Sequence, residues 1–115
     1  MKKKDRILIT GVAGFIGSEI CKKLLSQNFT IIGVDDLSTG IKTKVPSKIK
    51  FFKFDLSNYK NFKKLPKCDY ILHLAGQSSG DVSFDDPVGD LKKNTTSTLN
   101  LIKYGIACKA KKIIY

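Results

Sequence analysis

The chain alternates short apolar segments with segments that are polar or amphipathic. Five of the apolar segments are rich in β-branched and aromatic residues, which predicts β-strands. They cover residues 6–10, 29–35, 49–55, 69–75 and 111–115. Residues 6–9 and 31–34 are almost continuously apolar, as is typical of strands with both faces buried. The last segment, "KKIIY", is predicted to be a strand that is cut at its C-terminal end.

Helical periodicity fills the segments between these strands. Apolar residues recur every four positions through residues 15–27, which predicts an amphipathic helix. Ser57 can cap a short helix that runs to about Lys64, because Pro66 cannot continue it. A longer helix is expected from about Val88, and one face of it carries Leu91, Thr95, Thr98, Ile102 and Ile106. The polar segments are expected to form loops at residues 36–48 and 76–90.

Strands that alternate with helical segments predict a parallel sheet with helices on both faces. Right-handed crossovers between neighbouring strands then give a doubly wound α/β sheet of strand order 3-2-1-4-5. A length of 115 residues is enough for about one domain, and a hydrophobic share of 42% is enough for a packed core.

Charge and cysteine content narrow the possible functions. The net charge is +11, but all but one of the 21 basic residues are lysines, spread over the whole chain. A specific nucleic-acid reader would use more arginine, so a solvated lysine-rich surface is favoured over a nucleic-acid interface. Cys21, Cys68, Cys108 and the single His73 are far apart, which supports neither a metal site nor a disulfide framework and fits a reducing cytoplasm. Neither a membrane span nor a secretory signal is expected.

The stretch "TGVAGFIG" lies where the first strand meets the first helix. Gly11, Gly14 and Gly17 permit a tight turn, a close approach of a pyrophosphate to the main chain, and close packing of the helix on the strand. The N–H groups of Phe15 and Ile16 would then face the anion. Asp35 ends the next strand, where a carboxylate can accept both hydroxyls of an adenosine ribose and repel a 2′-phosphate. NAD is therefore favoured over NADP.

Five motifs, "TGVAGFIGSEI", "VDDLSTG", "FDLSN", "HLAGQSS" and "DP…N…TLNLI", occur in order along nearly the whole chain. Together they resemble the extended short-chain dehydrogenase/reductase family, and within it the NAD-dependent nucleotide-sugar epimerases and dehydratases. The resemblance implies a Rossmann fold, NAD as cofactor, a nucleotide-sugar substrate and a homodimer in the complete protein. The implied cofactor contacts are Gly11, Gly14, Phe15, Ile16, Gly17, Asp35, Asp36, Ser38, Thr39, Gly40, Asp55, Leu56, Leu74, Ala75, Gly76, Gln77 and Asn94.

Two positions depart from the family pattern. Ser97 stands where the motif N-x-x-G-T has glycine, so the packing of that helix is expected to differ. Ser78 stands close to where some 4-epimerases have a lysine that binds the nicotinamide ribose. His73 is expected to be a hydrogen-bonded strand residue rather than a catalytic one. Ser83 is the residue of the following loop that we expect nearest to the substrate.

The family chemistry needs a Ser or Thr and a Tyr-x-x-x-Lys pair, and the resemblance implies that both follow the fifth strand. Tyr59 and Lys63 match the pair by spacing only, since they fall between the third and fourth strands. We therefore assign no catalytic residue and expect residues 1–115 to be a partial NAD-binding domain that lacks its substrate domain and is inactive alone. The alternatives are a non-catalytic dinucleotide-binding module and, less favoured, a basic nucleic-acid-binding protein.

Overall fold

The computed structural model describes residues 4–76 and 80–115. Its centre is a parallel sheet with the order β3-β2-β1-β4-β5, which confirms the predicted fold class and strand order. The strands are β1 (Arg6–Thr10), β2 (Thr30–Asp35), β3 (Lys50–Lys53), β4 (Tyr70–His73) and β5 (Lys112–Ile114). β2 to β5 are each shorter than the predicted segments, although some flanking residues, such as Asp69 and Leu74, still form main-chain hydrogen bonds to β1.

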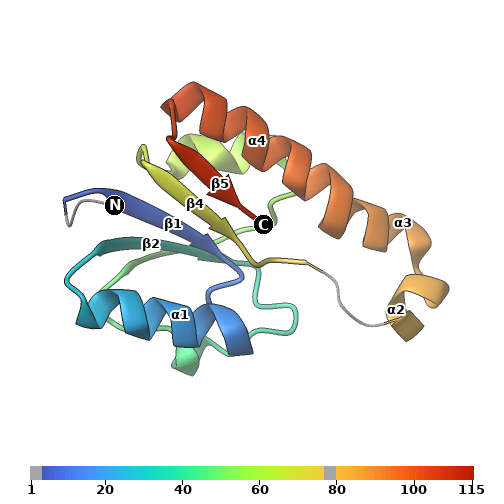
Figure 1. Ribbon diagram of the computed structural model, residues 1–115. Coiled ribbons are helices and arrows are strands. Elements are labelled where there is room, and N and C mark those ends of the chain that lie inside the picture. Colours follow the sequence, from blue (N-terminus) through green and yellow to red (C-terminus); the bar gives the residue numbers. More distant parts are fainter. Residues whose placement is uncertain (1–3, 77–79) are drawn as a thin grey trace.

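One helix covers each face of the sheet (Figure 1): α1 (Phe15–Ser26) packs below it and α4 (Ser97–Cys108) above it. Ile7, Leu8 and Ile9 are all completely buried in β1, because alternate side chains point into the two layers. Ile7 and Ile9 belong to the cluster on the α1 side, and Leu8 belongs to the cluster on the α4 side. This explains why a central strand has an uninterrupted apolar sequence. Within residues 4–76 and 80–115, no helix combines the length and the apolar character needed to cross a membrane.

The segment between β3 and β4 contains a 3-10 helix, η2 (Tyr59–Lys64). Its N-cap is Asn58, whose side chain accepts a hydrogen bond from the Lys60 N–H at 3.2 Å. The prediction of Ser57 as the cap was wrong by one position, because η2 begins at Tyr59 and the residue before it is Asn58. A second 3-10 turn, η1 (Lys42–Lys44), lies within the loop expected over residues 36–48.

The segment over residues 76–90 is not simply a loop, and that prediction was wrong in part. It contains two short helices, α2 (Gly80–Asp85) and α3 (Pro87–Leu91). Asp86 caps α3 by accepting from the Gly89 N–H at 3.0 Å, and Pro87 occupies the first turn. An Asp-Pro pair of this kind is a recognised start signal for a helix. A π-helical turn, η3 (Lys92–Thr96), then joins α3 to α4, so the long helix begins at Pro87.

The buried face of α4 differs from the face expected from the apolar spacing. Leu101 is 0% exposed, whereas Ile102 is 41% and Ile106 is 73% exposed. Leu91, which precedes the π turn, is also exposed, at 56%, so the expected apolar stripe faces solvent on both sides of η3. The buried residues of the helix are Ser97, Leu101, Tyr104 and Gly105.

We expect Leu101→Ala to lower the free energy of unfolding by about 2–5 kcal/mol, because it leaves a cavity in the layer between α4 and the sheet. Leu99→Ala is the matched control on the same helix, since Leu99 is 62% exposed. Its effect should stay within about 0.5 kcal/mol. Urea denaturation at concentrations where the chain is monomeric measures both. Equal losses would show that α4 buries a different face.

Candidate cofactor-binding site

The turn after β1 brings three main-chain segments into contact. Gly11 has φ +70°, and a Cβ there would lie 2.8 Å from the backbone N of Ala75. A Cβ on Gly17 would lie 2.1 Å from the carbonyl oxygen of Gly11. The turn is closed by the Gly14 N–H, which donates to the Gly11 carbonyl at 3.1 Å. No side chain separates β1, α1 and the end of β4 at this point, so their distances are set by main-chain contacts.

The first turn of α1 can receive an anion. Its N-cap residue, Gly14, provides no side-chain hydrogen bond, and the first turn contains no acidic residue. The side chains of Phe15 and Ile16 are 77% and 61% exposed, so they do not fill the core beneath the turn. The free main-chain N–H groups and the positive end of the helix dipole therefore suit a pyrophosphate, and the residues present fit a dinucleotide.

Asp35 lies at the end of β2 and holds the loop that follows it. One carboxylate oxygen accepts from the Ala13 N–H and the other from the Leu37 N–H, both at 2.9 Å. Leu37 has φ +60°, an uncommon conformation for a bulky residue and one that concentrates at functional sites. A carboxylate has about four acceptor positions, so Asp35 can still accept hydrogen bonds from ribose hydroxyls.

Asp36 forms an ion pair that the sequence did not predict. Lys93, from η3, places its Nζ 2.7 Å from Oδ2 of Asp36 and 3.3 Å from Oγ of Ser38. Burial acts to raise the pKa of Asp36, but the hydrogen bonds from Lys93 and Ser38 outweigh it and lower that pKa below its ordinary value. The hydrogen bond to Asp36 in turn raises the pKa of Lys93. The bridge ties η3 to the loop after β2.

The end of β4 is held by Thr10, the last residue of β1. The Thr10 hydroxyl oxygen accepts from the Ala75 N–H at 3.1 Å and shares the Leu74 N–H with the Thr10 carbonyl. His73, 4% exposed, hydrogen-bonds Thr10 through Nδ1 at 2.7 Å and Thr98 through Nε2 at 2.9 Å. The expectation of a hydrogen-bonded strand histidine is therefore met in the structure.

The predicted adenine contacts differ from one another in exposure. Asp55 is exposed in the loop that follows β3, and its Oδ1 accepts from the Ser57 N–H. Leu56 is only 5% exposed, and its side chain belongs to the core on the α4 side. The Leu56 carbonyl accepts from the Asn100 side chain at 2.9 Å. The Leu56 side chain thus serves packing.

Most of the predicted contact residues follow the carboxyl ends of the strands. The glycine turn follows β1, residues 35–40 end and follow β2, and residues 74–76 follow β4. Asn94 lies on η3 and donates to Asp90 Oδ1 at 2.8 Å, and a Cβ on Gly76 would lie 3.0 Å from Asn94 Oδ1. Ser38 and Thr39 are exposed. Gln77 and Ser78 lie outside the described residues.

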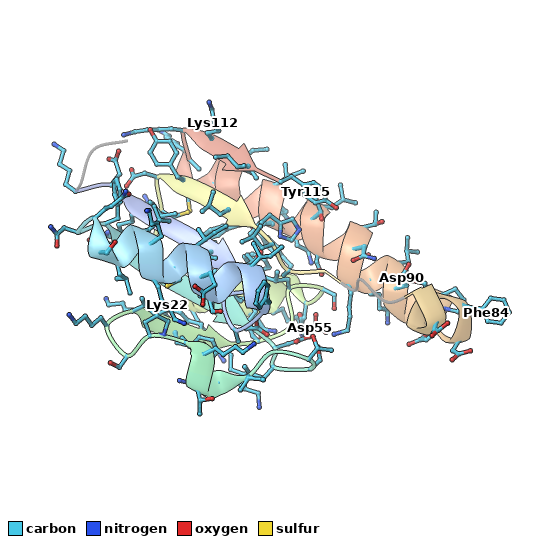
Figure 2. All side chains as sticks on the ribbon, turned by 60° about the horizontal axis from the view of Figure 1, so that its bottom comes forward. Lys22, Asp55, Phe84, Asp90, Lys112 and Tyr115 are labelled. Atoms are coloured by element: carbon cyan, nitrogen blue, oxygen red, sulfur yellow. The ribbon has the colours of Figure 1, made fainter. Side chains whose placement is uncertain are left out.

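Two further sequence expectations are clarified by contacts. Ser83 in α2 donates to Asp90 Oδ1 at 2.9 Å, which ties α2 to α3. Figure 2 shows α2 and α3 at the end of the molecule away from the strands, with Asp90 and Phe84 marking that end.

Ser97, which replaces the glycine of the family motif, is 3% exposed and donates to the Lys92 carbonyl at 2.9 Å. Its hydroxyl is therefore accommodated within the π turn.

Tyr59 and Lys63, which match the Tyr-x-x-x-Lys spacing, both lie in η2. The Tyr59 ring stacks on Phe62 at 5.3 Å, and the Lys103 ammonium lies 4.2 Å from the Tyr59 ring centre. These contacts attach η2 to α4. They support the view that the Tyr-x-x-x-Lys spacing here is incidental.

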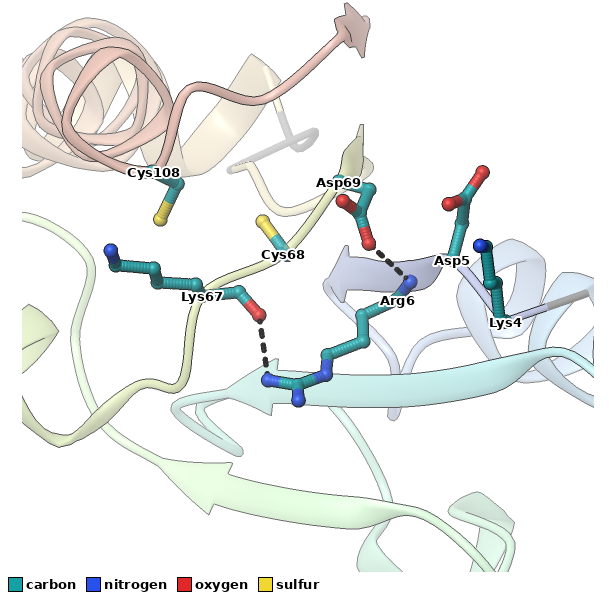
Figure 3. A pocket seen from close by; sticks show the side chains of 7 residues that line it. All are labelled: Lys4, Asp5, Arg6, Lys67, Cys68, Asp69 and Cys108. Atoms are coloured by element: carbon teal, nitrogen blue, oxygen red, sulfur yellow. Dashed lines mark hydrogen bonds between the residues drawn. The ribbon is translucent and has the colours of Figure 1, made fainter. Parts of the chain in front are cut away.

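Two open cavities, of about 450 and 540 Å³, lie near the amino ends of the strands, at the end of the sheet opposite the glycine turn. The first surrounds the start of β1, where Arg6 donates to Asp69 and to the Lys67 carbonyl (Figure 3). In open parallel sheets, ligands bind outside the carboxyl ends of the strands. The glycine turn and Asp35 are therefore the better site, although neither cavity includes them. Among the described residues, no group of three or more His, Cys, Asp or Glu could hold a metal ion.

A parallel sheet of order 3-2-1-4-5, a glycine turn after β1 and an acid at the end of β2 define a dinucleotide-binding fold of the Rossmann class. The model of the NAD dependent epimerase/dehydratase family matches residues 7–115. The chain belongs to this family.

Named relatives agree with this assignment. The chain is 34% identical to the UDP-glucose 4-epimerase of Mycolicibacterium smegmatis, over 96% of this chain and 37% of that protein. It is 38% identical to UDP-glucuronic acid decarboxylase 1 of Danio rerio, over 88% of this chain and 24% of that protein. The crystal structure of the Thermus thermophilus UDP-glucose 4-epimerase in complex with NAD matches with a TM-score of 0.89 and 34% identity, over 96% of this chain and 36% of that chain. The chain thus spans about a quarter to a third of these relatives.

We expect Gly17→Ala to lower the free energy of unfolding by about 3 kcal/mol, because its Cβ would overlap the Gly11 carbonyl and push α1 away from β1. Gly14→Ala is the matched control. Its Cβ would lie 3.3 Å from the same oxygen, and φ at Gly14 is −81°. The control should lose less than about 1 kcal/mol in denaturant titrations. Similar losses for both variants would contradict the close contact at Gly17.

The stability of the chain should depend on His73 at mildly acidic pH. Burial lowers the pKa of His73 below its ordinary value of 6.5, so the unfolded chain binds a proton that the folded chain does not. The free energy of unfolding should therefore fall as the pH falls below about 6.5, until the lowered pKa is reached. His73→Asn should lack this component. Parallel stability curves between pH 7.5 and the acid limit of folding would contradict the shift.

Proposed function

We propose that this chain is the NAD-binding part of a nucleotide-sugar epimerase or dehydratase. The observation that carries the proposal is the joint placement of the glycine turn and Asp35 at the carboxyl ends of β1 and β2, where Asp35 accepts from the Ala13 N–H at 2.9 Å and α1 begins directly after the turn. Family membership supports the cofactor. Relatives named as UDP-glucose 4-epimerases and as a UDP-glucuronic acid decarboxylase support the substrate class.

The residues have separate roles in holding NAD. The main-chain N–H groups of Phe15 and Ile16 bind the pyrophosphate, and Asp35 accepts the hydroxyls of the adenosine ribose. Residues 36–40 and Asp55 surround the adenosine half. Residues 74–76, with Asn94 beside them, form the wall along the rest of the cofactor. When bound there, NAD would supply reversible hydride transfer with the sugar, through the keto-sugar intermediate that the family resemblance implies.

The acid–base residues of that reaction are not among residues 1–115. The resemblance implies that a Ser or Thr and a Tyr-x-x-x-Lys follow the fifth strand, and the chain spans 37% or less of the relatives described above. Residues 1–115 alone are therefore proposed to bind cofactor without turnover. A non-catalytic dinucleotide-binding module is the second candidate, since the described residues hold a dinucleotide site but no catalytic pair.

The remaining proposals concern partners and compartment. Leu99, Ile102 and Ile106 expose an apolar face of α4, and we propose that a second copy of the complete protein covers it. The three thiols, Cys21, Cys68 and Cys108, are free, which supports a reducing compartment such as the cytoplasm.

We expect Asp35→Ala to weaken NAD binding by about 10- to 100-fold, because one or two hydrogen bonds to a charged acceptor are lost. Asp35→Asn removes the charge and keeps one acceptor oxygen, at the loss of one of the two main-chain hydrogen bonds, and its affinity for NADP should move closer to its affinity for NAD. Asp85→Ala, an exposed site in α2, is the control for net charge. Calorimetric titration with both cofactors measures the effects. Unchanged NAD affinity in Asp35→Ala would contradict its role at the ribose.

A further inference from the structure

A chain of hydrogen bonds crosses the molecule just beneath the proposed cofactor site. It runs from the Ala75 N–H to the Thr10 hydroxyl, then to His73, and from there to Thr98. Thr98 donates onward to the Asn94 carbonyl at 2.6 Å. The chain links β1, β4 and the long helix, and both of its ends lie on segments that the proposed function places against NAD.

The directions of these bonds follow from the donors. The Thr10 oxygen accepts from main-chain N–H groups, so its own hydrogen is free to donate to Nδ1 of His73. The Thr98 hydroxyl hydrogen is directed to the Asn94 carbonyl, so Thr98 must accept from Nε2. Both arguments require a neutral imidazole with its proton on Nε2. An imidazolium would also donate from Nδ1, and the Thr10 oxygen, which already accepts from two main-chain N–H groups, would then have to accept a third hydrogen bond.

The close surroundings of His73 restrict where its ring can lie. It is 4% exposed, and the Tyr115 ring lies 5.4 Å from its ring. The Ala75 nitrogen that Thr10 holds is also the atom that approaches the Gly11 turn, 2.8 Å from where a Cβ would be. A shift of the Thr10 hydroxyl would therefore move the end of β4 relative to the glycine turn, across the space between the two walls of the site.

We propose that His73 is a positioning residue for the cofactor, which as the neutral Nε2–H tautomer orients the Thr10 hydroxyl and so fixes the end of β4 against the glycine turn. His73 itself contacts neither the pyrophosphate turn nor the ribose acid. The inference rests on the proposed function, because it concerns the binding of NAD.

The test uses the full-length protein that carries this sequence and measures NAD affinity by calorimetry. His73→Phe fills the space but cannot bond Thr10, and its Kd for NAD should rise about tenfold. His73→Asn restores an acceptor near Nδ1 and should stay within about threefold of the wild type. Ile71→Val is the control for a general loss of stability, since Ile71 is fully buried in the same strand. It should lower the melting temperature and leave the Kd unchanged.

A second measurement does not depend on cofactor binding. Nitrogen-15 chemical shifts of the imidazole, assigned by comparison with His73→Asn, should show a protonated Nε2 and an unprotonated Nδ1 at neutral pH. Thr98→Val removes the acceptor for Nε2 and should give a mixture of tautomers. This variant also serves if His73→Phe does not fold, and its Kd for NAD should rise about threefold.

The outcomes separate the two proposals. Wild-type protein that binds no NAD would contradict the proposed function, and the tautomer measurement would then still test the hydrogen-bond chain. Wild-type protein that binds NAD, with His73→Phe or Thr98→Val equal to it, would overturn the positioning role. That role is also overturned if the proton lies on Nδ1, or if Ile71→Val weakens NAD binding as much as His73→Phe does.

Discussion

The contact of bare main chain between the Gly11 turn, Gly17 and the end of β4 is the constraint on which the rest of this edge depends. Side chains at Gly11 and Gly17 would overlap carbonyl or amide atoms at 2.1 to 2.8 Å, so the three segments can meet only without them. Their approach sets the direction of α1 and hence the aim of its first N–H groups. It also brings the Ala75 N–H to the Thr10 hydroxyl. The same main-chain contacts therefore determine both the packing of these segments and the geometry of the proposed site.

Such an arrangement places polar groups in a buried region, where each must find a partner. The middle of the sheet avoids the difficulty, since Ile7, Leu8 and Ile9 bury only apolar side chains. At the carboxyl edge, Thr10 and His73 are as buried as the core and are both hydrogen-bonded. No buried side-chain nitrogen or oxygen in the described parts of the chain lacks a partner. The fold can hold a polar site at this edge because the buried polar side chains beneath it, Thr10 and His73, are hydrogen-bonded as well.

The sequence predicted what is encoded locally. Apolar runs indicated the strands, and the spacing of Gly11, Gly14 and Gly17 indicated the turn. The buried face of α4 was missed, because it includes Ser97 and Gly105, which give no apolar signal, whereas the apolar Ile102 and Ile106 are exposed. The Asp36–Lys93 ion pair and the Thr10–His73 hydrogen bond join residues 57 and 63 positions apart, so only the tertiary fold brings them together. The Asp86–Pro87 helix start could have been recognised.

The carboxylates at this edge of the sheet have the opposite charge to the lysine-rich surface of the rest of the chain. A net charge of +11 attracts nucleotides in general and without regard to their identity. Yet Asp36, Asp55 and Asp35 all raise the pKa of Lys93, with Asp36 contributing most, so three carboxylates lie near this lysine, at the end of the site that the proposed function gives to the adenosine. Lys93 offsets part of that charge but is already paired. If NAD binds as proposed, an additional phosphate on the ribose would meet carboxylates, whereas the pyrophosphate would meet neutral N–H groups at α1. Under the proposed function, attraction would come from the lysine-rich surface, and discrimination between cofactors would come from the acids at the end of β2 and after β3.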